Sequence, residues 1–479
     1  MGTGEVIETN TLVIGAGPGG YVAAIRLGQL GVPHVLVEKG ELGGTCLNVG
    51  CIPSKALISA SKLVEQIRHG KSIGIEVSDV RIDLGRMMAW KDTVVGKLTG
   101  GVGGLVKGNG GKVVRGRARF VGPHEAVVAG PPGEGGETRV RFEHAIIATG
   151  SVPSPIAGFA FDGENVLSST EALAFSKVPE RLVVIGGGYI GMELGGVWQR
   201  LGSQVTVVEY LDQLLPGFEQ DLVRPVAKRF KDAGGEVLLS TRAIGWDRGE
   251  GGAGRRVKVH LEERASGQRK VLDCDHVLLT VGRRPLTDGL ELERAGLTTD
   301  GGGFIAVDGA QRTAVPHIFA IGDVAGQPML AHKASKEAEV AAEVIAGHPA
   351  AYDFRAVPAV VFTDPEIATV GLSVKDAKAA GHEVAVGKFL FAANGRALSL
   401  NDTDGFVRVI ADKQSGVLLG FEAVGPEVSN LVAEAALALE MGAQASELGQ
   451  TIHAHPTLAE AVMEAANAAL GQAVHALNR

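Results

Sequence analysis

Two of the chain's three cysteines lie in residues Gly43–Lys55, which read GGTCLNVGCIPSK, with four residues between them. Pro53 follows Cys51 closely and is a plausible first residue of a helical pattern that runs through Lys62. A helix N-terminus lowers the pKa of a nearby thiol and favours the reactive thiolate. A pair of buried structural cysteines is the alternative, and zinc is less favoured because no second pair completes a tetrahedral site. We therefore expect a redox dithiol at Cys46 and Cys51.

A candidate base for these thiols lies near the other end of the chain, in residues His453–Glu460, which read HAHPTLAE. The proline begins a helical pattern over Thr457–Leu470 and places Glu460 one turn into it. From there the carboxylate can turn back to a preceding histidine, orient its ring and raise its basicity. A histidine near a helix cap is more often structural, so both interpretations stay open from these residues alone.

A nucleotide site is predicted where the strand pattern Thr11–Ile14 runs into Gly15, Gly17 and Gly20, spaced as G-x-G-x-x-G. A helical pattern follows, and a second strand ends at Glu38, about twenty residues on. In this context the glycines permit a tight turn and let backbone N–H groups approach a pyrophosphate at the helix N-terminus. The acid is expected to bond ribose hydroxyls.

The same order recurs after the strand Leu182–Ile185, with Gly186, Gly188 and Gly191 before a helix and Glu209 at the next strand end. One such pattern alone is often only a tight turn, but two complete copies indicate two dinucleotides. Residues 210–213 read YLDQ and hold no arginine for a 2′-phosphate, which the acid would also repel. The second site is therefore expected to prefer NAD over NADP, and FAD is the natural candidate for the first.

Two further strand ends support FAD at the first site. An apolar strand from Ala145 ends in Thr149 and Gly150, and another from Ile318 ends in Gly322 and Asp323. Each end taken alone is more often a plain turn. Beside the first glycine pattern, each is expected to close near the flavin nucleotide, with Asp323 bonding its ribityl chain.

Composition limits the classes of function that remain. The chain has 479 residues, 45% hydrophobic and 21% charged, and a net charge of −8, which favours a multidomain globular protein and disfavours nucleic-acid binding. Three cysteines do not make a secreted disulfide framework, and Cys274 is expected to be inert. No signal peptide and no membrane-spanning run is recognised, so a cytoplasmic protein is expected.

The glycine-rich stretches are expected at the ends of elements. Gly100–Gly111 is interpreted as a helix end, Gly130–Gly136 as a hairpin loop and Asp247–Gly254 as another loop. From about Val357 onwards, short strand patterns alternate with helical ones, which indicates an α+β domain. The strands expected there are Ala359–Phe362, Gly405–Ile410 and Gly416–Ala423, and the helices are Val428–Met441 and Thr457–Leu470.

From about Thr9 to its last helix, the chain resembles the pyridine nucleotide–disulfide oxidoreductases, and within them the enzymes that oxidise dihydrolipoamide. The most specific stretches are GGTCLNVGCIPSK, GGGYIGMELGGVWQRLGSQVTVVE, MLAHKA and HAHPTLAE. The resemblance implies an α/β fold with two Rossmann-like domains, for FAD and NAD, and a C-terminal α+β dimerisation domain. The implied segments are 1–152 (first part of the FAD domain, with the redox disulfide), 153–282 (NAD domain), 283–355 (completing the FAD domain) and 356–479 (interface).

The resemblance also assigns roles to single residues. Cys46 would be the thiol that meets lipoamide and Cys51 the thiol beside the flavin. His455 would be the base, oriented by Glu460, and would serve the partner subunit's Cys46 in a homodimer. Lys55 would lie near the flavin and pair with Glu193.

The complete set expected to bind FAD is Gly15, Gly17, Pro18, Gly19, Gly20, Glu38, Lys39, Gly44, Thr45, Cys46, Lys55, Ala118, Thr149, Gly150, Asp323, Met329, Leu330, Ala331 and His332. The set expected to bind NAD is Gly186, Gly188, Tyr189, Ile190, Gly191, Glu193, Glu209, Ala243 and Gly282. No metal is expected. The implied partners are the lipoyl domains of 2-oxo acid dehydrogenase complexes or of the glycine cleavage system.

Near relatives differ at identifiable positions. Glutathione reductases carry arginines at the NADP site and usually an alanine where this chain has Gly191. Mercuric reductases add a C-terminal cysteine pair, whereas this chain ends in GQAVHALNR. Soluble transhydrogenases lack one disulfide cysteine. The alternatives that remain are an NAD(P)H-dependent reductase of another small disulfide, or an inactive flavoprotein subunit.

Overall fold

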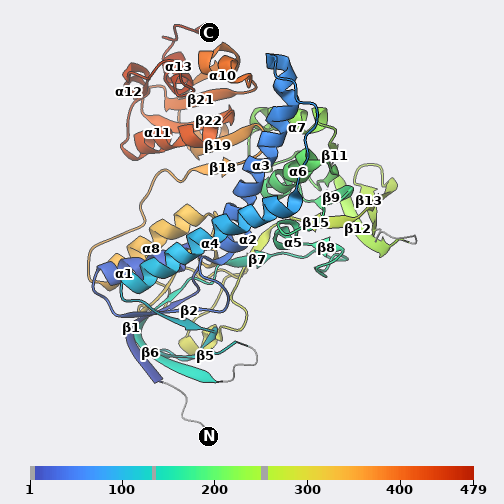
Figure 1. Ribbon diagram of the computed structural model, residues 1–479. Helices are drawn as coiled ribbons and strands as arrows, with labels where there is room; N and C mark the ends of the chain where they lie inside the picture. The colour runs from blue at the N-terminus through green and yellow to red at the C-terminus, as the bar shows by residue number, and fades with distance from the viewer. Residues whose placement is uncertain (1–5, 132–135, 250–256, 479) are drawn as a thin grey trace. The chain divides into compact units, whose positions relative to one another are not determined.

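The computed structural model describes residues 6–131, 136–249 and 257–478 (Figure 1). The chain forms two compact units. The first comprises Met1–Ala56, Gly85–Ser154 and Gly282–Asp353, and the second comprises Leu57–Leu84, Pro155–Val281 and Phe354–Arg479. The four-segment domain division stays a prediction; of the stretch 283–355, expected to complete the FAD domain, residues 283–353 lie in the first unit and the last two in the second.

The first unit is built on a seven-stranded sheet of order β3-β2-β1-β6-β5-β4, with β17 pairing with β6. Strands β3, β2, β1, β6 and β17 run parallel, whereas β4, β5 and β6 form an antiparallel meander. Its strands are β1 (Val6–Ile14), β2 (His34–Glu38), β3 (Lys112–Arg115), β4 (Arg117–Gly122), β5 (Glu125–Ala129), β6 (Glu137–Ile147) and β17 (Ile318–Ala320). A separate pair joins β7 (Ser151–Pro153) to β16 (Arg283–Pro285).

Each face of this sheet has its own core, because alternate residues of a strand point to opposite faces. Val13, Leu36 and Ile146 pack against helices α1 (Pro18–Gln29), α4 (Leu84–Gly108) and α8 (Ala331–Ile345), which lie together over the strands in Figure 1. The opposite face packs against the meander and the loop that contains the 3-10 turn η2 (Leu292–Ala295). The turn η3 (Gly322–Val324) follows β17 directly.

The second unit begins with a second strand–helix–strand arrangement. Its five parallel strands have the order β11-β10-β9-β15-β8, and three antiparallel strands, β12-β13-β14, follow. These are β8 (Val166–Leu167), β9 (Arg181–Ile185), β10 (Gln204–Val208), β11 (Glu236–Leu238), β12 (Thr241–Arg248), β13 (Val257–Glu263), β14 (Arg269–Cys274) and β15 (His276–Leu279). The helices are α3 (Cys51–His69, which begins in the first unit), α5 (Ser169–Ala172), α6 (Tyr189–Leu201) and α7 (Gln220–Asp232), with the turn η1 (Gly70–Ile73) after α3.

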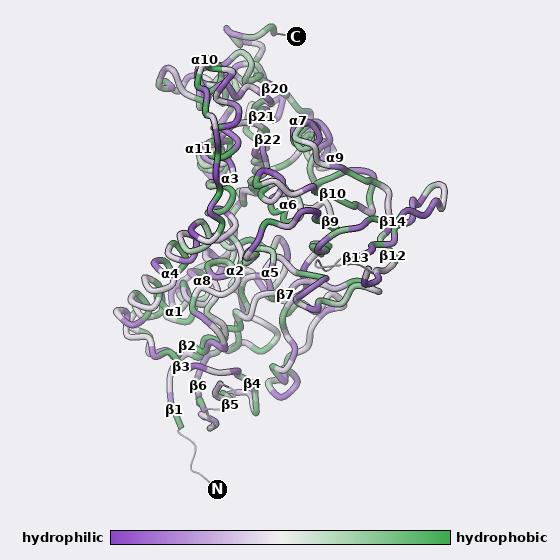
Figure 2. The backbone as a smooth tube through the Cα atoms, turned by 45° about the vertical axis from the view of Figure 1, so that its right-hand side comes forward, coloured by the Kyte–Doolittle hydropathy of each residue, from purple (hydrophilic) through white to green (hydrophobic). Residues whose placement is uncertain are grey.

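The last part of the second unit is an antiparallel sheet of order β18-β19-β22-β21-β20, covered by helices α11, α12 and α13. Hydrophobic and hydrophilic residues are interleaved along its elements (Figure 2), as expected where each element buries one face. The strands are β18 (Ala359–Val361), β19 (Glu366–Gly371), β20 (Val384–Leu390), β21 (Phe406–Asp412) and β22 (Leu418–Gly425). The helices are α9 (Val374–Ala379), α10 (Gly395–Leu400) after the turn η4 (Phe391–Ala393), α11 (Val428–Glu440), α12 (Ala445–Gln450) and α13 (Glu460–Ala469).

Two helix starts differ from the expectation. Helix α3 begins at Cys51, so Pro53 is its third residue, and the helix continues to His69 instead of ending at Lys62. Helix α13 begins at Glu460, which is therefore its first residue and not one turn in. In both cases a proline lies near the start, but proline alone does not mark the first helical residue.

The glycine-rich stretches have different outcomes. Helix α4 ends at Gly108, as expected of a stretch that terminates a helix. Strands β5 and β6 form the predicted hairpin, with residues 132–135 of its loop outside the described chain. The predicted loop Asp247–Gly254 begins later than expected because Asp247 and Arg248 still belong to β12, and residues 250–256 are not described. None of the helices in the described ranges is long and apolar enough to cross a membrane.

The glycines inside α4 lead to a stability prediction. A methyl group added at Gly101 or Gly104 would meet no atom within 4 Å, and both residues are exposed. Gly101→Ala and Gly104→Ala should each stabilise the protein by about 0.5–1 kcal/mol, because alanine loses less backbone entropy in a helix. Denaturant unfolding should show higher midpoints.

Gly28→Ala in α1 is the matched control, because its new methyl group would overlap the carbonyl oxygen of Asn109. It should lower the unfolding midpoint. A lower midpoint for Gly101→Ala as well would contradict the helical assignment of this stretch.

Candidate active site

The first glycine turn joins β1 to α1 through two close approaches. Gly15 has a φ of +100°, and a side chain there would overlap the carbonyl oxygen of Ala148 at the end of β6. A Cβ at Gly20 would overlap the carbonyl oxygen of Gly15. A Cβ at Gly17, by contrast, would meet nothing within 4 Å. The turn is therefore tight on the protein side and open at its middle glycine, where a pyrophosphate can approach the start of α1.

The second glycine turn repeats these three environments. Gly186 has a φ of +104° and lies against the carbonyl oxygen of Thr280, and a Cβ at Gly191 would overlap the carbonyl oxygen of Gly186. Gly188 precedes α6 and again faces open space. Both turns thus fit a dinucleotide by the same backbone geometry.

The two acids are held by the turns themselves. Glu38 accepts hydrogen bonds from the N–H of Ala16 (2.8 Å) and of Gly40 (2.7 Å). Glu209 accepts them from the N–H of Gly187 (2.6 Å) and of Leu211 (2.8 Å). Each carboxylate therefore braces its turn, a role that the sequence pattern did not indicate. Their bonds to ribose hydroxyls stay predictions, and the remaining lone pairs of each carboxylate are available for them.

The predicted flavin residues gather at one edge of the sheet because neighbouring parallel strands end together. Ile14 is in register with Ile147, and Ile147 with Ala320. Gly15, Thr149 and Asp323 therefore follow adjacent strand ends. The Thr149 hydroxyl donates to the carbonyl oxygen of Leu286 (2.7 Å), so in this structure it serves the fold.

Asp323 has partners that sequence reasoning missed. The hydroxyl of Ser151 donates to its carboxylate, and Nε of Arg283 donates to the same hydroxyl (2.8 Å). On the other side, the N–H of Gly322 donates to Glu337 of α8 (2.7 Å), which forms a buried ion pair with Lys333 (2.6 Å). The sequence signal for these partners is weak: it consists of Ser151, a possible hydrogen-bond donor that follows Thr149 and Gly150.

The remaining predicted FAD residues occupy varied positions. Met329 and Leu330 immediately precede α8, and Ala331 and His332 are its first residues. Ala118 is buried within β4, and Lys39 is exposed after β2. Among the described residues, no group of three or more His, Cys, Asp or Glu side chains is arranged to hold a metal ion.

The dithiol segment is docked on the first glycine turn. The N–H of Gly43 donates to the carbonyl oxygen of Ala16 (2.8 Å), and a Cβ at Gly44 would lie 2.6 Å from Cα of Gly17. Helix α2 (Gly44–Val49) begins there and carries Cys46. Cys46 and Cys51 are both present as reduced thiols.

The pKa of Cys46 runs against the expectation for a thiol at a helix N-terminus. The hydrogen bond to Cys51 and burial raise the pKa of Cys46 well above its usual range, and the Lys55 charge opposes this only in part. The expected lowering is therefore wrong for Cys46 in the dithiol form, because removing its proton breaks the contact with Cys51. Cys51 is exposed and is the first residue of α3.

The two histidines of HAHPTLAE have different partners. Nε2 of His453 contacts Glu434 of α11 (2.8 Å), and the side chain is only 5% exposed. Nδ1 of His455 contacts Glu460 (2.9 Å), and its side chain is 79% exposed. Glu460 also accepts from the N–H of Thr457 (2.8 Å). The predicted contact between Glu460 and a preceding histidine is therefore present, and it involves His455.

The carboxylate of this dyad is stabilised in its charged form. Partial burial raises the pKa of Glu460, but the hydrogen bonds from Thr457 and His455 outweigh it, so the net shift is downward. A charged Glu460 accepts the Nδ1 proton of His455 and leaves Nε2 to face outward as the basic nitrogen. The His455–Glu460 dyad is thus suited to take a proton from an incoming group.

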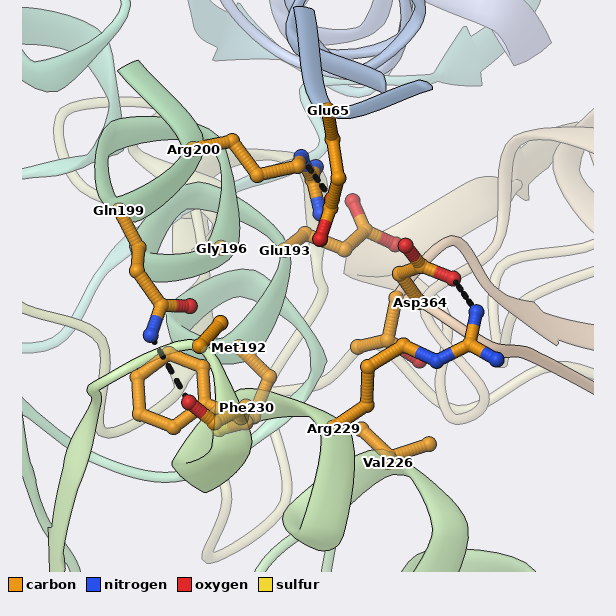
Figure 3. Close-up of a pocket in the computed structure, with 12 residues that line it drawn as sticks. Glu65, Met192, Glu193, Gly196, Gln199, Arg200, Val226, Arg229, Phe230 and Asp364 are labelled. Atoms are coloured by element: carbon orange, nitrogen blue, oxygen red, sulfur yellow. Dashed lines mark hydrogen bonds and ion pairs between the residues drawn. The ribbon is translucent and has the colours of Figure 1, made fainter. Parts of the chain in front are cut away.

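Glu193 lies within the second unit at a small charged cavity (Figure 3). Its carboxylate accepts the N–H of Phe362 (2.9 Å), which ties α6 to the residues after β18. Arg229 also lines the cavity and contacts Asp364 (2.6 Å). Burial, with the Asp364 charge, raises the pKa of Glu65 there. Sequence reasoning missed this network, since its members come from α3, α6, α7 and the segment before β19.

The predicted residues divide between the two units. The FAD set and the dithiol belong to the first unit, whereas the His455–Glu460 dyad and the NAD set, apart from Gly282, belong to the second. Lys55 and Glu193 fall in different units, so their pairing stays a prediction. Ala243 lies in β12 at a register shift against β13.

Comparison with known proteins defines the class. The pyridine nucleotide-disulphide oxidoreductase family matches residues 9–338, and the dimerisation domain of the same family matches residues 357–466. The chain therefore belongs to the pyridine nucleotide-disulphide oxidoreductase family. This confirms the family and the α/β fold with a C-terminal dimerisation domain that the sequence predicted.

Similar proteins narrow the class further. The dihydrolipoyl dehydrogenase of Haloferax volcanii is 53% identical over 98% of this chain and 98% of its own length. The dihydrolipoyl dehydrogenase of Geobacillus stearothermophilus is 51% identical over 99% of this chain and 98% of its own length. Among solved structures, LpdA of Mycobacterium tuberculosis matches with a TM-score of 0.88 and 28% identity, over 96% of this chain and 99% of its own.

The second glycine turn gives a prediction that separates folding from binding. Gly188→Ala should leave the thermal midpoint nearly unchanged, because its methyl group meets no atom, yet raise the KM for NAD⁺ about tenfold by obstructing the backbone approach. Gly191→Ala should destabilise the protein by about 1–3 kcal/mol, because its methyl group overlaps the Gly186 carbonyl oxygen. An unchanged KM in a folded Gly188→Ala protein would mean that this turn does not bind the nucleotide.

Proposed function

We propose that the protein is a dihydrolipoyl dehydrogenase, which oxidises dihydrolipoamide to lipoamide and passes the electrons to NAD⁺. The observation that carries the proposal is the Cys46–Cys51 dithiol, docked through Gly43 and Gly44 on the first of two dinucleotide turns. Relatives of about half-identical sequence over nearly the full length carry this name, and they support the same substrate.

The His455–Glu460 dyad supplies the base. Because Nδ1 is bonded to Glu460, the exposed Nε2 takes the proton from a dihydrolipoamide thiol. The charged carboxylate then stabilises the imidazolium that forms. In this way a substrate thiol becomes a thiolate nucleophile near neutral pH.

The dithiol exchanges with the substrate through a mixed disulfide. In the oxidised enzyme, Cys46 and Cys51 would share a disulfide bond. The substrate thiolate attacks Sγ of Cys46, forms a new S–S bond and releases Cys51 as a thiolate. The second substrate thiol then attacks the substrate sulfur of the mixed disulfide, passes its proton to the departing Sγ of Cys46 and closes the lipoamide ring. Two electrons have reduced the Cys46–Cys51 pair, and the two protons of the substrate lie on His455 and Cys46 while Cys51 is a thiolate.

The two glycine turns would hold the cofactors. FAD, bound at the first turn by the residues around Gly17, Glu38 and Asp323, would carry the electron pair from the dithiol to NAD⁺ at the second turn. Gly188 and Glu209 are assigned to NAD⁺. The homodimeric state, the lipoyl-domain partners and the cytoplasmic location belong to the same proposal.

A steady-state assay tests the function directly. The holoenzyme should oxidise dihydrolipoamide with NAD⁺ and show little turnover with glutathione disulfide or mercuric ion. Cys46→Ser should abolish dihydrolipoamide oxidation because the sulfur that accepts the substrate thiolate is gone. Cys274→Ser serves as the matched control, since Cys274 lies in the core of the second unit at β14. Efficient glutathione disulfide reduction would favour a different disulfide reductase.

Subunit mixing tests whether two chains share one site. Cys46→Ser and His455→Ala homodimers should each lose activity, the second by about 10²–10⁴-fold, the usual value of positioned proton transfer. If His455 serves the partner subunit's Cys46, a mixed dimer holds one doubly altered site and one intact site.

Mixed dimers should therefore regain about half of the wild-type rate per dimer. Subunit exchange is checked independently with tagged chains. Proven exchange without any regained activity would mean that His455 acts within its own chain.

A further inference from the structure

An arginine lies beside Tyr210, the residue after the acid of the second dinucleotide turn, although residues 210–213 themselves contain none. Glu209 follows β10, and Tyr210 comes next. The guanidinium of Arg264 lies 4.0 Å from the centre of the Tyr210 ring, and its Nη1 donates to the Tyr210 carbonyl oxygen (3.0 Å). Arg264 follows β13 and is 54 residues from Tyr210 in sequence. The local pattern YLDQ could not reveal it.

Backbone hydrogen bonds fix Arg264 at this place. The backbone N–H of Arg264 donates to the carbonyl oxygen of Ser240 (2.9 Å). The N–H of Ser240 in turn donates to the carbonyl oxygen of Leu211 (2.8 Å). The N–H of Thr241 donates to the carbonyl oxygen of Glu209 (2.9 Å). The turn after β13 is therefore attached, through the start of β12, to the residues that follow the acid.

The chemistry of this pair of residues concerns the 2′ position of the adenosine ribose. In a dinucleotide turn of this kind the acid bonds the 2′-hydroxyl, whereas a nearby arginine accommodates a 2′-phosphate. A guanidinium is always charged and presents five donors in a rigid plane suited to phosphate. One donor and the ring face hold the group against Tyr210, so its direction is set before any ligand arrives.

We propose that Arg264 is a specificity-determining residue of the second dinucleotide site, and that Glu209 alone keeps NADP⁺ out. The site then holds both determinants: a carboxylate that repels a 2′-phosphate and a guanidinium that binds one. This inference rests on the proposed function only in taking the second turn as the nicotinamide nucleotide site. It revises the sequence argument, which attributed the preference for NAD partly to missing arginines.

The test is a double-mutant cycle of Glu209→Gln, Arg264→Gln and the double variant, made in the full-length holoenzyme. The quantity measured is the ratio of kcat/KM with NADP⁺ to kcat/KM with NAD⁺. Glu209→Gln should raise this ratio at least tenfold without any added arginine, because the repulsion is removed while the guanidinium remains. Adding Arg264→Gln should remove most of that gain, by about tenfold.

Arg269→Gln is the control for loss of a surface charge, since Arg269 lies on β14 against Glu262 (3.3 Å) and its side chain is 73% exposed. It should leave the ratio unchanged. Titration calorimetry provides a second measurement, the affinity for a nucleotide fragment, which does not depend on catalysis. Adenosine 2′,5′-bisphosphate should bind the Glu209→Gln protein more tightly than the double variant, whereas adenosine 5′-monophosphate should distinguish them much less.

Equal ratios in Glu209→Gln and the double variant would overturn the proposal, as would equal affinities for adenosine 2′,5′-bisphosphate. If Glu209→Gln does not fold because its turn is no longer braced, the ratio is compared between wild type and Arg264→Gln. It should fall severalfold in Arg264→Gln, and an unchanged ratio refutes the proposal. Absence of NAD⁺-dependent dihydrolipoamide oxidation in the wild type would instead contradict the proposed function.

Discussion

Both dinucleotide turns depend on the residue that follows the first glycine. In the first turn, the N–H of Ala16 donates to Glu38, and its carbonyl oxygen accepts from Gly43. In the second, the N–H of Gly187 donates to Glu209, and its carbonyl oxygen accepts from Leu215 (2.8 Å). In each turn a single residue, through its N–H and its carbonyl oxygen, thus joins the turn to the acid at the next strand end and to a loop that comes later in the chain.

The consequence is that the acids cannot be treated as ligand groups alone. A carboxylate that accepts two backbone N–H groups fixes the turn while keeping lone pairs for a ribose. The close approaches at Gly15 and Gly20 bring the start of α1 to the sheet edge, and the acid prevents the turn from opening. The glycines and the acid that are expected to bind the nucleotide are therefore the same residues that stabilise the turn.

Local sequence patterns predicted most of the two strand–turn–helix units, because the interactions that form these units act between residues close in sequence. Strand and helix periodicity, glycines at positive φ and an acid at a strand end all act over a few residues, and those predictions agree with β1, α1, β9 and α6. The family and the dimerisation domain followed from longer motifs. By contrast, the partners of Asp323 and Tyr210 lie far away in sequence, and no spacing rule reaches them. The raised pKa of Cys46 likewise depends on a neighbouring thiol and on burial, not on the helix terminus alone.

The two histidines in HAHPTLAE have different roles: one anchors the segment and the other presents an oriented ring to solvent. His453 is turned inward to Glu434 and anchors the segment to α11, so the chain on either side of it is held. His455 is held through Glu460 and presents its ring to solvent. A base that reacts only within its own unit can be enclosed by that unit, which excludes water from it. An exposed, oriented imidazole on a dimerisation domain is instead suited to a thiol that arrives from outside that domain.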